Sequence, residues 1–167
     1  HLGGGGAAVQ PDLVAKIEER IKGRPSTGYG LTEVNGVITI NSAHFFLAKP
    51  ESAGPALPIM EARIVAEDGT DQPAGGKGEL WVRGANVFRG YLNQPEANAE
   101  ILTDGWFHTG DIGYLDDDGF LFLVDRVKDM VLRGGENVYS AGAEAPLHHH
   151  PATAAAARSP VPDQPHG

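Results

Sequence analysis

The sequence predicts an α/β protein, and the part of the fold within this chain is predicted to be α+β. A helix near the start is followed by a compact sheet of antiparallel hairpins. Two observations predict this. Apolar residues recur at helical spacing between residues 11 and 22, and from residue 36 to 133 short β-rich runs are interrupted by Gly, Pro and Asp. The 167 residues are enough to bury a sizeable core.

Two helices are predicted. The first spans residues 11–22, "PDLVAKIEERIK", with Pro11 in its first turn and Gly23 just beyond its last. Its apolar positions are Leu13, Val14, Ile17 and Ile21. The second is one or two turns within residues 94–102, "QPEANAEIL", where Pro95 suits a helix start and Glu96 suits the positive end of the helix dipole.

Predicted strands lie in four stretches, at residues 60–70, 78–84, 105–125 and 129–135. The acidic "EDG" at 67–69 and "DDDG" at 116–119 are typical of turns. "GGKG" at 75–78 is not a phosphate loop, because position 71 is Asp and a glycine follows Lys77, so a hairpin turn is favoured. "DDDG" lacks the glutamate that a calcium-binding loop requires, which favours a solvated turn.

Composition excludes several classes of function. The chain carries 13 basic and 22 acidic residues, a net charge of −9, so neither a nucleic acid nor an anionic membrane surface is an expected partner. It has no cysteine, which excludes disulfides, thiolate metal sites and a cysteine nucleophile. No apolar run approaches the ~20 residues of a membrane-spanning helix, and the start is unlike a signal peptide, so a cytoplasmic location is expected. The first residue is His1 rather than Met, and we expect the chain to be a piece of something longer.

The composition changes again after Tyr139. Residues 146–167 contain five prolines, the histidine triplet at 148–150, an alanine run, and only two large aliphatic residues, Leu147 and Val161. Such a segment can bury little apolar area, so ordered structure is not expected there. Adjacent histidines rarely converge on one ion, so a metal site at the triplet is not favoured.

The stretch "GWFHTGD" at 105–111 has two interpretations. An Asp after a Gly is common in turns, where its side chain bonds nearby backbone amides. Alternatively, Trp106 and Phe107 anchor a strand by burial, and the strand ends where Asp111 is presented to a ligand. The residues alone leave both interpretations open.

Five stretches occur in a characteristic order. They are "GGGGAAVQP" (3–11), "GYGLTE" (28–33), "GELWVRGANVFRGY" (78–91), "GWFHTGD" (105–111) and "DRVKDMVLRGGENVYSAGAEA" (125–145). Together they resemble the AMP-forming adenylating superfamily, which includes acyl-CoA synthetases, luciferases and peptide-synthetase adenylation domains. "VDRVKDMVLRGGENVYS" is most similar to the acyl-CoA synthetases. The resemblance implies that residues 1–124 are the C-terminal part of the large AMP-binding domain, 125–129 a hinge, and 130–167 a truncated, degenerate start of the small C-terminal domain.

The resemblance also implies roles for individual residues in holding ATP or AMP. Gly6 and Ala7 resemble a segment whose backbone lies along adenine, where a side chain would block the approach. Tyr29 resembles the ring that stacks on adenine, although a buried core tyrosine is the alternative. The resemblance also places Gly28 and Gly30, which flank Tyr29, among the cofactor-binding residues.

Three further roles concern the phosphates, the ribose and a conformational change. Thr32 resembles the hydroxyl that bonds the α-phosphate, and Glu33 the carboxylate that holds Mg²⁺. Asp111 resembles the ribose ligand and Arg126 its partner there. Lys128 occupies the position at which the small domain of the family rotates.

The implied reaction has two halves. A carboxylic acid, with fatty acids among the candidates, reacts with ATP to give an acyl adenylate and pyrophosphate, and coenzyme A then displaces AMP. The family's Ser/Thr/Gly-rich phosphate loop is absent from this chain, and no lysine follows Lys128. We therefore expect that this polypeptide alone does not form adenylates.

Two other interpretations remain open at the level of the sequence. One is a non-catalytic nucleotide-binding or interaction module derived from such an enzyme. The other is an assembly module built on the β-rich region, without nucleotide affinity. The sequence near the end departs from the family, with Gly142 where a glutamate is usual and Pro146 inside an expected helix. These departures indicate either a tail that has decayed or a region that is not under folding constraint.

Overall fold

The computed structural model of the chain describes residues 2–4, 19, 25–129, 131–133 and 136–138. The predicted helix at 11–22 therefore lies outside the described residues except for Glu19, which is helical. Gly6, Ala7, the histidine triplet and the whole tail from residue 139 also lie outside them. No helix in the described part is long and apolar enough to cross a membrane.

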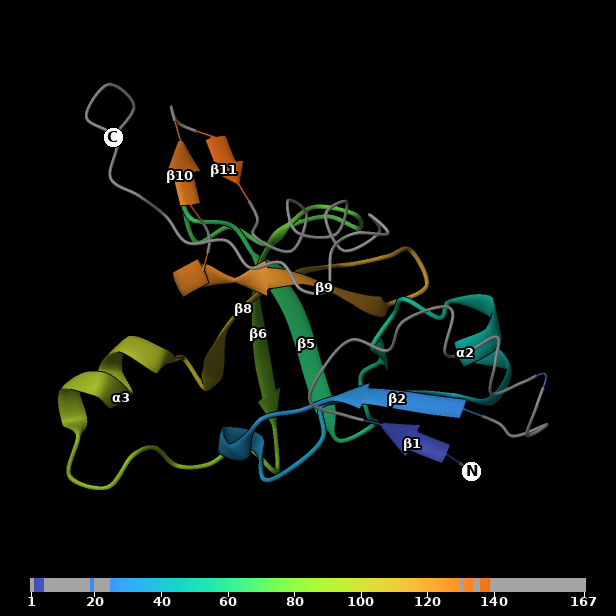
Figure 1. Cartoon of the computed structure of the whole chain (residues 1–167). Helices are drawn as coiled ribbons and strands as arrows, with labels where there is room; N and C mark the ends of the chain where they lie inside the picture. Colours follow the sequence, from blue (N-terminus) through green and yellow to red (C-terminus); the bar gives the residue numbers. More distant parts are fainter. Residues whose placement is uncertain (1, 5–18, 20–24, 130, 134–135, 139–167) are drawn as a thin grey trace, which may run out of the picture.

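A six-stranded sheet forms the main body of the described structure (Figure 1). Its order is β4 (Gly54–Pro55), β9 (Phe120–Arg126), β8 (Trp106–Leu115), β6 (Gly78–Gly84) and β5 (Met60–Val65), with β7 (Leu102–Thr103) paired to β8. Every pairing in this sheet is antiparallel. The predicted hairpins 60–84 and 105–125 are thus confirmed as β5–β6 and β8–β9.

The hydrophobic core lies on one face of this sheet. Strand β6 alternates as an amphipathic strand should, with Leu80 and Val82 fully buried. The core cluster consists of Val34, Ile38, Met60, Ile64, Leu80, Val82, Phe107 and Leu121. Burial of Phe107 agrees with its predicted role as a strand anchor.

A second, smaller sheet packs beside the first. Its strands are β1 (Leu2–Gly4), β2 (Pro25–Tyr29) and β3 (Thr39–Ser42); β1 and β2 are parallel, whereas β2 and β3 are antiparallel. In β3 the polar Thr39 and Asn41 are fully buried, and Ile40 is exposed. Thr39 donates to the carbonyl of Ala53 at 2.8 Å, and the Asn41 amide donates to two carbonyls, so these polar groups connect the sheet to the loop before β4.

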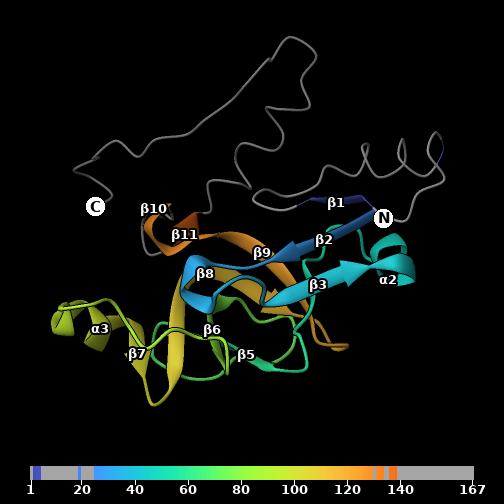
Figure 2. The same ribbon diagram turned by 90° about the horizontal axis from the view of Figure 1, so that it is seen from below.

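Short helices and turns complete the described part. Figures 1 and 2 place α2 (Ala43–Ala48) and α3 (Pro95–Ile101) on opposite sides of the molecule. The second predicted helix is confirmed, and it begins at Pro95 as expected. Two 3-10 turns, η1 (Thr32–Val34) and η2 (Val127–Asp129), follow β2 and β9. A separate hairpin pairs β10 (Val131–Arg133) with β11 (Glu136–Val138).

The predicted turns form, with two differences. The turn near "GGKG" is closed by the Gly76 amide donating to the carbonyl of Pro73 at 2.9 Å, so it begins before the predicted residues. In "DDDG", Asp116 accepts amide hydrogen bonds from Asp118 and Phe120, but the turn is not purely solvated. The ammonium of Lys49 pairs with Asp116, and with Asp118 at 2.7 Å.

The expectation that a strand ends at Asp111 is wrong. Strand β8 continues from Trp106 to Leu115, so Asp111 lies in its interior. Gly110 has φ of +71°, and the register of β8 shifts against both neighbouring strands in this region. These features describe a bulge, which re-aims a side chain without ending the ladder.

Candidate functional site

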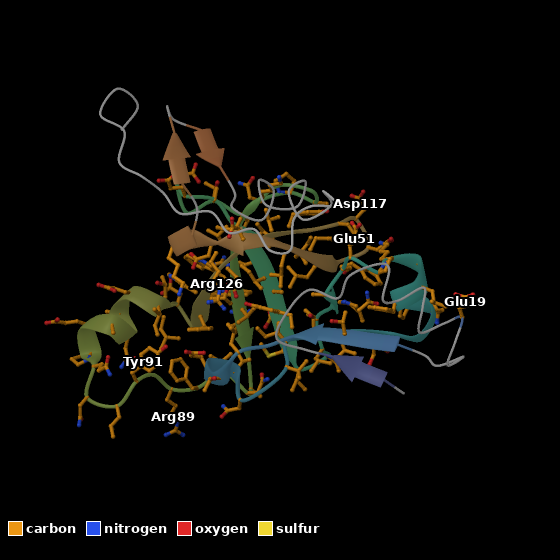
Figure 3. The ribbon with its side chains drawn as sticks, viewed as in Figure 1. Glu19, Glu51, Arg89, Tyr91, Asp117 and Arg126 are labelled. Atoms are coloured by element: carbon orange, nitrogen blue, oxygen red, sulfur yellow. The ribbon has the colours of Figure 1, made fainter. Side chains whose placement is uncertain are left out.

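An open cavity of about 1210 Å³ lies where η1, the bulge of β8 and the end of β9 meet. The predicted site residues in its wall are Gly30, Thr32, Glu33, Asp111, Arg126 and Lys128. Residues that are far apart in the sequence are therefore brought together here. Figure 3 shows Arg126 and Tyr91 on the side of the sheet that carries α3.

Asp111 is the most buried charged group of the site, with only 7% of its surface exposed. Its Oδ2 accepts a hydrogen bond from the Tyr29 hydroxyl, and its Oδ1 lies 3.2 Å from Nε of Arg126. The sheet register pairs Asp111 directly with Arg126 across β8 and β9. Its carboxylate therefore bonds partners from two other strands, rather than the following amides as an Asx turn would require.

The bulge that aims Asp111 is held by polar contacts with β6. The Thr109 hydroxyl donates to the carbonyl of Leu80 at 2.8 Å and accepts from the Asp111 amide at 3.1 Å. The Gly110 amide donates to one oxygen of Glu79 at 2.9 Å, and the Trp81 indole donates to the other at 2.9 Å. Because both Glu79 oxygens are engaged, Glu79 fixes the backbone immediately before Asp111.

Tyr29 lies behind the cavity wall rather than in it. Its ring packs against the hydrophobic core, and burial, followed by the hydrogen bond to Asp111, raises the pKa of its hydroxyl far above the usual range. The hydroxyl therefore remains a donor. In this arrangement Tyr29 matches the core-tyrosine alternative in its packing, and stacking on adenine stays a prediction.

The two glycines beside Tyr29 are explained by close backbone packing. A Cβ on Gly30 would lie 1.8 Å from the carbonyl oxygen of Gly36, and one on Gly28 would lie 2.7 Å from that of Thr39. Neither position has room for a side chain. Their role in cofactor binding stays a prediction.

Thr32 and Glu33 lie on η1 at the cavity rim. Thr32 is exposed, while the carboxylate Oε1 of Glu33 accepts a hydrogen bond from the Tyr91 hydroxyl at 2.7 Å. Within the described residues no group of three or more His, Cys, Asp or Glu could hold a metal by itself. A lone carboxylate at an open rim still fits Mg²⁺, because this ion keeps several waters and binds through one or two carboxylates plus phosphates.

Arg126 and Lys128 form the other side of the cavity. Both are exposed at the surface, Arg126 at the end of β9 and Lys128 in η2. Their two positive charges can attract an anionic ligand locally, against the carboxylates of Glu33, Glu79, Glu100 and Asp111 in the same wall.

Among the wall residues that were not predicted as site residues are Glu79, Tyr91 and His108. Glu79 and Tyr91 lie in the quoted stretch "GELWVRGANVFRGY", Glu79 as its second residue and Tyr91 as its last, but no role in the site is predicted for either. His108 stacks on Trp81, with ring centroids 3.7 Å apart, and its buried Nε2 has no hydrogen-bond partner among the described residues. Burial lowers the pKa of His108, and the charge of Arg63 lowers it further against an opposing effect of Glu79.

Comparison with known proteins gives consistent matches. A family model described as "AMP-binding enzyme" matches residues 1–92. A feruloyl-CoA synthase from an Amycolatopsis species is 43% identical over 160 residues, which is 95% of this chain and 32% of that protein.

Solved structures of related enzymes are also similar to this chain. The o-succinylbenzoate CoA synthetase from Bacillus subtilis, in complex with the acyl-adenylate intermediate OSB-AMP, superposes with a TM-score of 0.89 at 37% identity, over 98% of this chain and 33% of that one. In complex with ATP and magnesium ion, the same synthetase gives 0.88 at 38% identity, over 96% of this chain and 33% of that one. This chain thus spans about a third of the length of the proteins it matches.

Proposed function

Because the chain belongs to the AMP-binding enzyme family, we propose that it supplies the nucleotide-binding part of a longer AMP-forming acid–CoA ligase. The observation that carries this proposal is the pairing of buried Asp111 with Arg126 in the wall of a cavity whose rim bears Thr32 and Glu33. The similarity to a synthetase that binds ATP and magnesium ion supports it.

In the proposed site, different residues bind the ribose and the phosphates. A carboxylate accepts hydrogen bonds but cannot donate them, so Asp111 suits the two ribose hydroxyls, which must donate. Arg126 holds the carboxylate from the side and keeps its direction fixed. Gly6 and Ala7, which lie outside the described residues, are assigned to the adenine together with Tyr29 and its flanking glycines.

Charge neutralisation takes place at the opposite rim. The Thr32 hydroxyl would donate to an α-phosphate oxygen, and the Glu33 carboxylate would hold the cation. Magnesium, when bound, neutralises phosphate charge as pyrophosphate departs. Lys128 lies in the segment 125–129, which is assigned as the hinge between the residues 1–124 of the large domain and the small domain that begins at residue 130.

The proposed reaction proceeds in two steps. An oxygen of the acid attacks the α-phosphorus, and the bond to the departing pyrophosphate breaks, giving the acyl adenylate. The sulfur of coenzyme A then attacks the acyl carbon, AMP leaves with the bonding electron pair, and the thiol proton passes to solvent. Both steps depend mainly on positioning and charge stabilisation.

The acid is assigned only as a carboxylic acid. The relatives carry ferulate and o-succinylbenzoate in their names, both aromatic acids, whereas a fatty acid has no such support. Aromatic carboxylates are therefore the first substrates to test, with fatty acids as the comparison.

Two measurements test the function. The purified chain should bind ATP and AMP, measured by calorimetry. A chimera, with this chain replacing the matching third of the Bacillus subtilis synthetase, should catalyse acid-dependent exchange of labelled pyrophosphate into ATP, while the chain alone should not. A chain that binds no nucleotide, together with a folded but inactive chimera, would contradict the proposal.

A further inference from the structure

Glu33 is contacted by residues 88–91, a segment to which no catalytic role is assigned. The Phe88 amide donates to the Glu33 carbonyl at 2.7 Å, and the Tyr91 hydroxyl donates to the Glu33 carboxylate at 2.7 Å. The loop after β6 therefore contacts both the backbone and the side chain of Glu33. These contacts span 55 and 58 residues of sequence, so they are a property of the fold rather than of a local turn.

Tyr91 is itself fixed in place. Its amide donates to Oδ1 of Asn98 at 2.6 Å, and the Asn98 side-chain amide returns a hydrogen bond to the Tyr91 carbonyl at 2.8 Å. Its ring meets Phe88 edge-on at 5.0 Å, and Phe88 in turn meets the buried Phe107 edge-on at 5.6 Å. The phenol is thus anchored to α3 and to the core, although 38% of the residue is exposed.

The hydrogen bond distinguishes the two oxygens of Glu33. Oε1 is occupied by Tyr91, whereas no hydrogen bond from the described residues reaches Oε2. Glutamate has three rotatable side-chain bonds, and an untethered one at a rim would sample many rotamers. Tyr91 removes that freedom and leaves one oxygen available in a defined direction.

We infer that Tyr91 is a positioning residue that orients Glu33 for coordination of a divalent cation through Oε2. This rests on the proposed function, in which Glu33 holds the magnesium of magnesium–ATP. Mg²⁺ demands near-octahedral geometry, so it gains from a carboxylate offered through a single oriented oxygen.

The competing explanation is that Tyr91 only covers the core beside Phe88. Replacement by phenylalanine separates the two, because Tyr91→Phe keeps the ring and removes the hydroxyl. Tyr114→Phe is a matched control, since the Tyr114 ring stacks on Phe122 at 4.9 Å and does not line the cavity.

The experiment measures ATP affinity of the full 167-residue chain by calorimetry, with and without Mg²⁺, and takes the ratio as the magnesium enhancement. Tyr91→Phe should lower this enhancement about 3- to 10-fold, as expected for one lost hydrogen bond to a charged group at a partly exposed site. Affinity without Mg²⁺ should stay unchanged, and the urea midpoint should fall by no more than the loss of one partly exposed hydrogen bond accounts for. In a Glu33→Gln background, Tyr91→Phe should have no further effect on the enhancement.

Each other outcome overturns the inference in a distinguishable way. An equal enhancement in wild type and Tyr91→Phe would exclude the positioning role while leaving nucleotide binding intact. A loss of ATP affinity without Mg²⁺ would show that Tyr91 shapes the cavity itself. If wild type binds no ATP under either condition, the proposed function fails and this inference fails with it.

Discussion

Arg126 and Asp111 are direct neighbours across β9 and β8, and Nε of Arg126 lies 3.2 Å from Oδ1 of Asp111. The pair is asymmetric: the Asp111 side chain is 10% exposed, whereas that of Arg126 is 55% exposed. A buried carboxylate is thereby balanced by a cation that itself remains largely hydrated. This arrangement pairs the buried carboxylate of Asp111 with a cation at the cavity wall without burying a second ion.

Replacing Arg126 should therefore affect binding more than folding. Arg126→Ala should weaken ATP binding several-fold, because Asp111 loses its lateral support, and should cost about 1 kcal/mol of unfolding free energy, since Arg126 is half exposed. Calorimetry and urea denaturation measure the two effects. Arg89→Ala, at an exposed arginine outside the cavity wall, is the control and should change neither.

Glu79 should prove essential to the bulge although we assign it no ligand. Glu79→Ala leaves the Gly110 amide and the Trp81 indole without their acceptor, which should cost about 1–3 kcal/mol in urea denaturation. ATP binding should fall as well, because the backbone before Asp111 is released. Glu61→Ala, which removes an exposed carboxylate of the same sheet, should preserve ATP affinity. Full ATP affinity in Glu79→Ala would show that the bulge forms without Glu79.

His108 should make stability depend on pH. Burial lowers its pKa below the ordinary 6.5, so the unfolded chain takes up a proton that the folded chain does not. Stability should therefore decrease as the pH falls below 6.5, until the lower pKa of folded His108 is passed. His108→Gln should reduce the difference in urea midpoint between pH 7.5 and pH 5.5; a difference as large as in wild type would contradict this explanation.

Much of the fold follows from local signals in the sequence. Pro95 marks the start of α3, and the alternation that buries Leu80 and Val82 marks β6. Turn residues with positive φ, such as Gly69 and Gly119, separate the strands as predicted. Each of these signals involves residues that are close together in the sequence, so it can be recognised from the sequence alone.

The features that sequence reasoning missed are non-local. Gly110 suggested a strand end, but the carboxylate of Glu79 caps the bulge from β6 and the ladder continues to Leu115. In β3 the usual pattern is inverted: polar Asn41 is buried, with its side-chain NH2 donating to the carbonyls of Lys49 and Ser52 although its Oδ1 has no partner among the described residues, while Ile40 is exposed. The contact between Tyr91 and Glu33 joins residues that no local pattern could pair.

The central claim, that Asp111 binds the ribose, is tested most directly by comparing ATP with 2′,3′-dideoxy-ATP in wild type and Asp111→Ala. Wild type should prefer ATP by roughly 10- to 10³-fold, since each hydrogen bond to a charged group contributes ~1.5–3 kcal/mol. The ratio of the two affinities is insensitive to any general loss of stability in the variant. Asp111→Ala should bind both nucleotides equally; a variant that still prefers ATP as strongly as wild type would contradict the account.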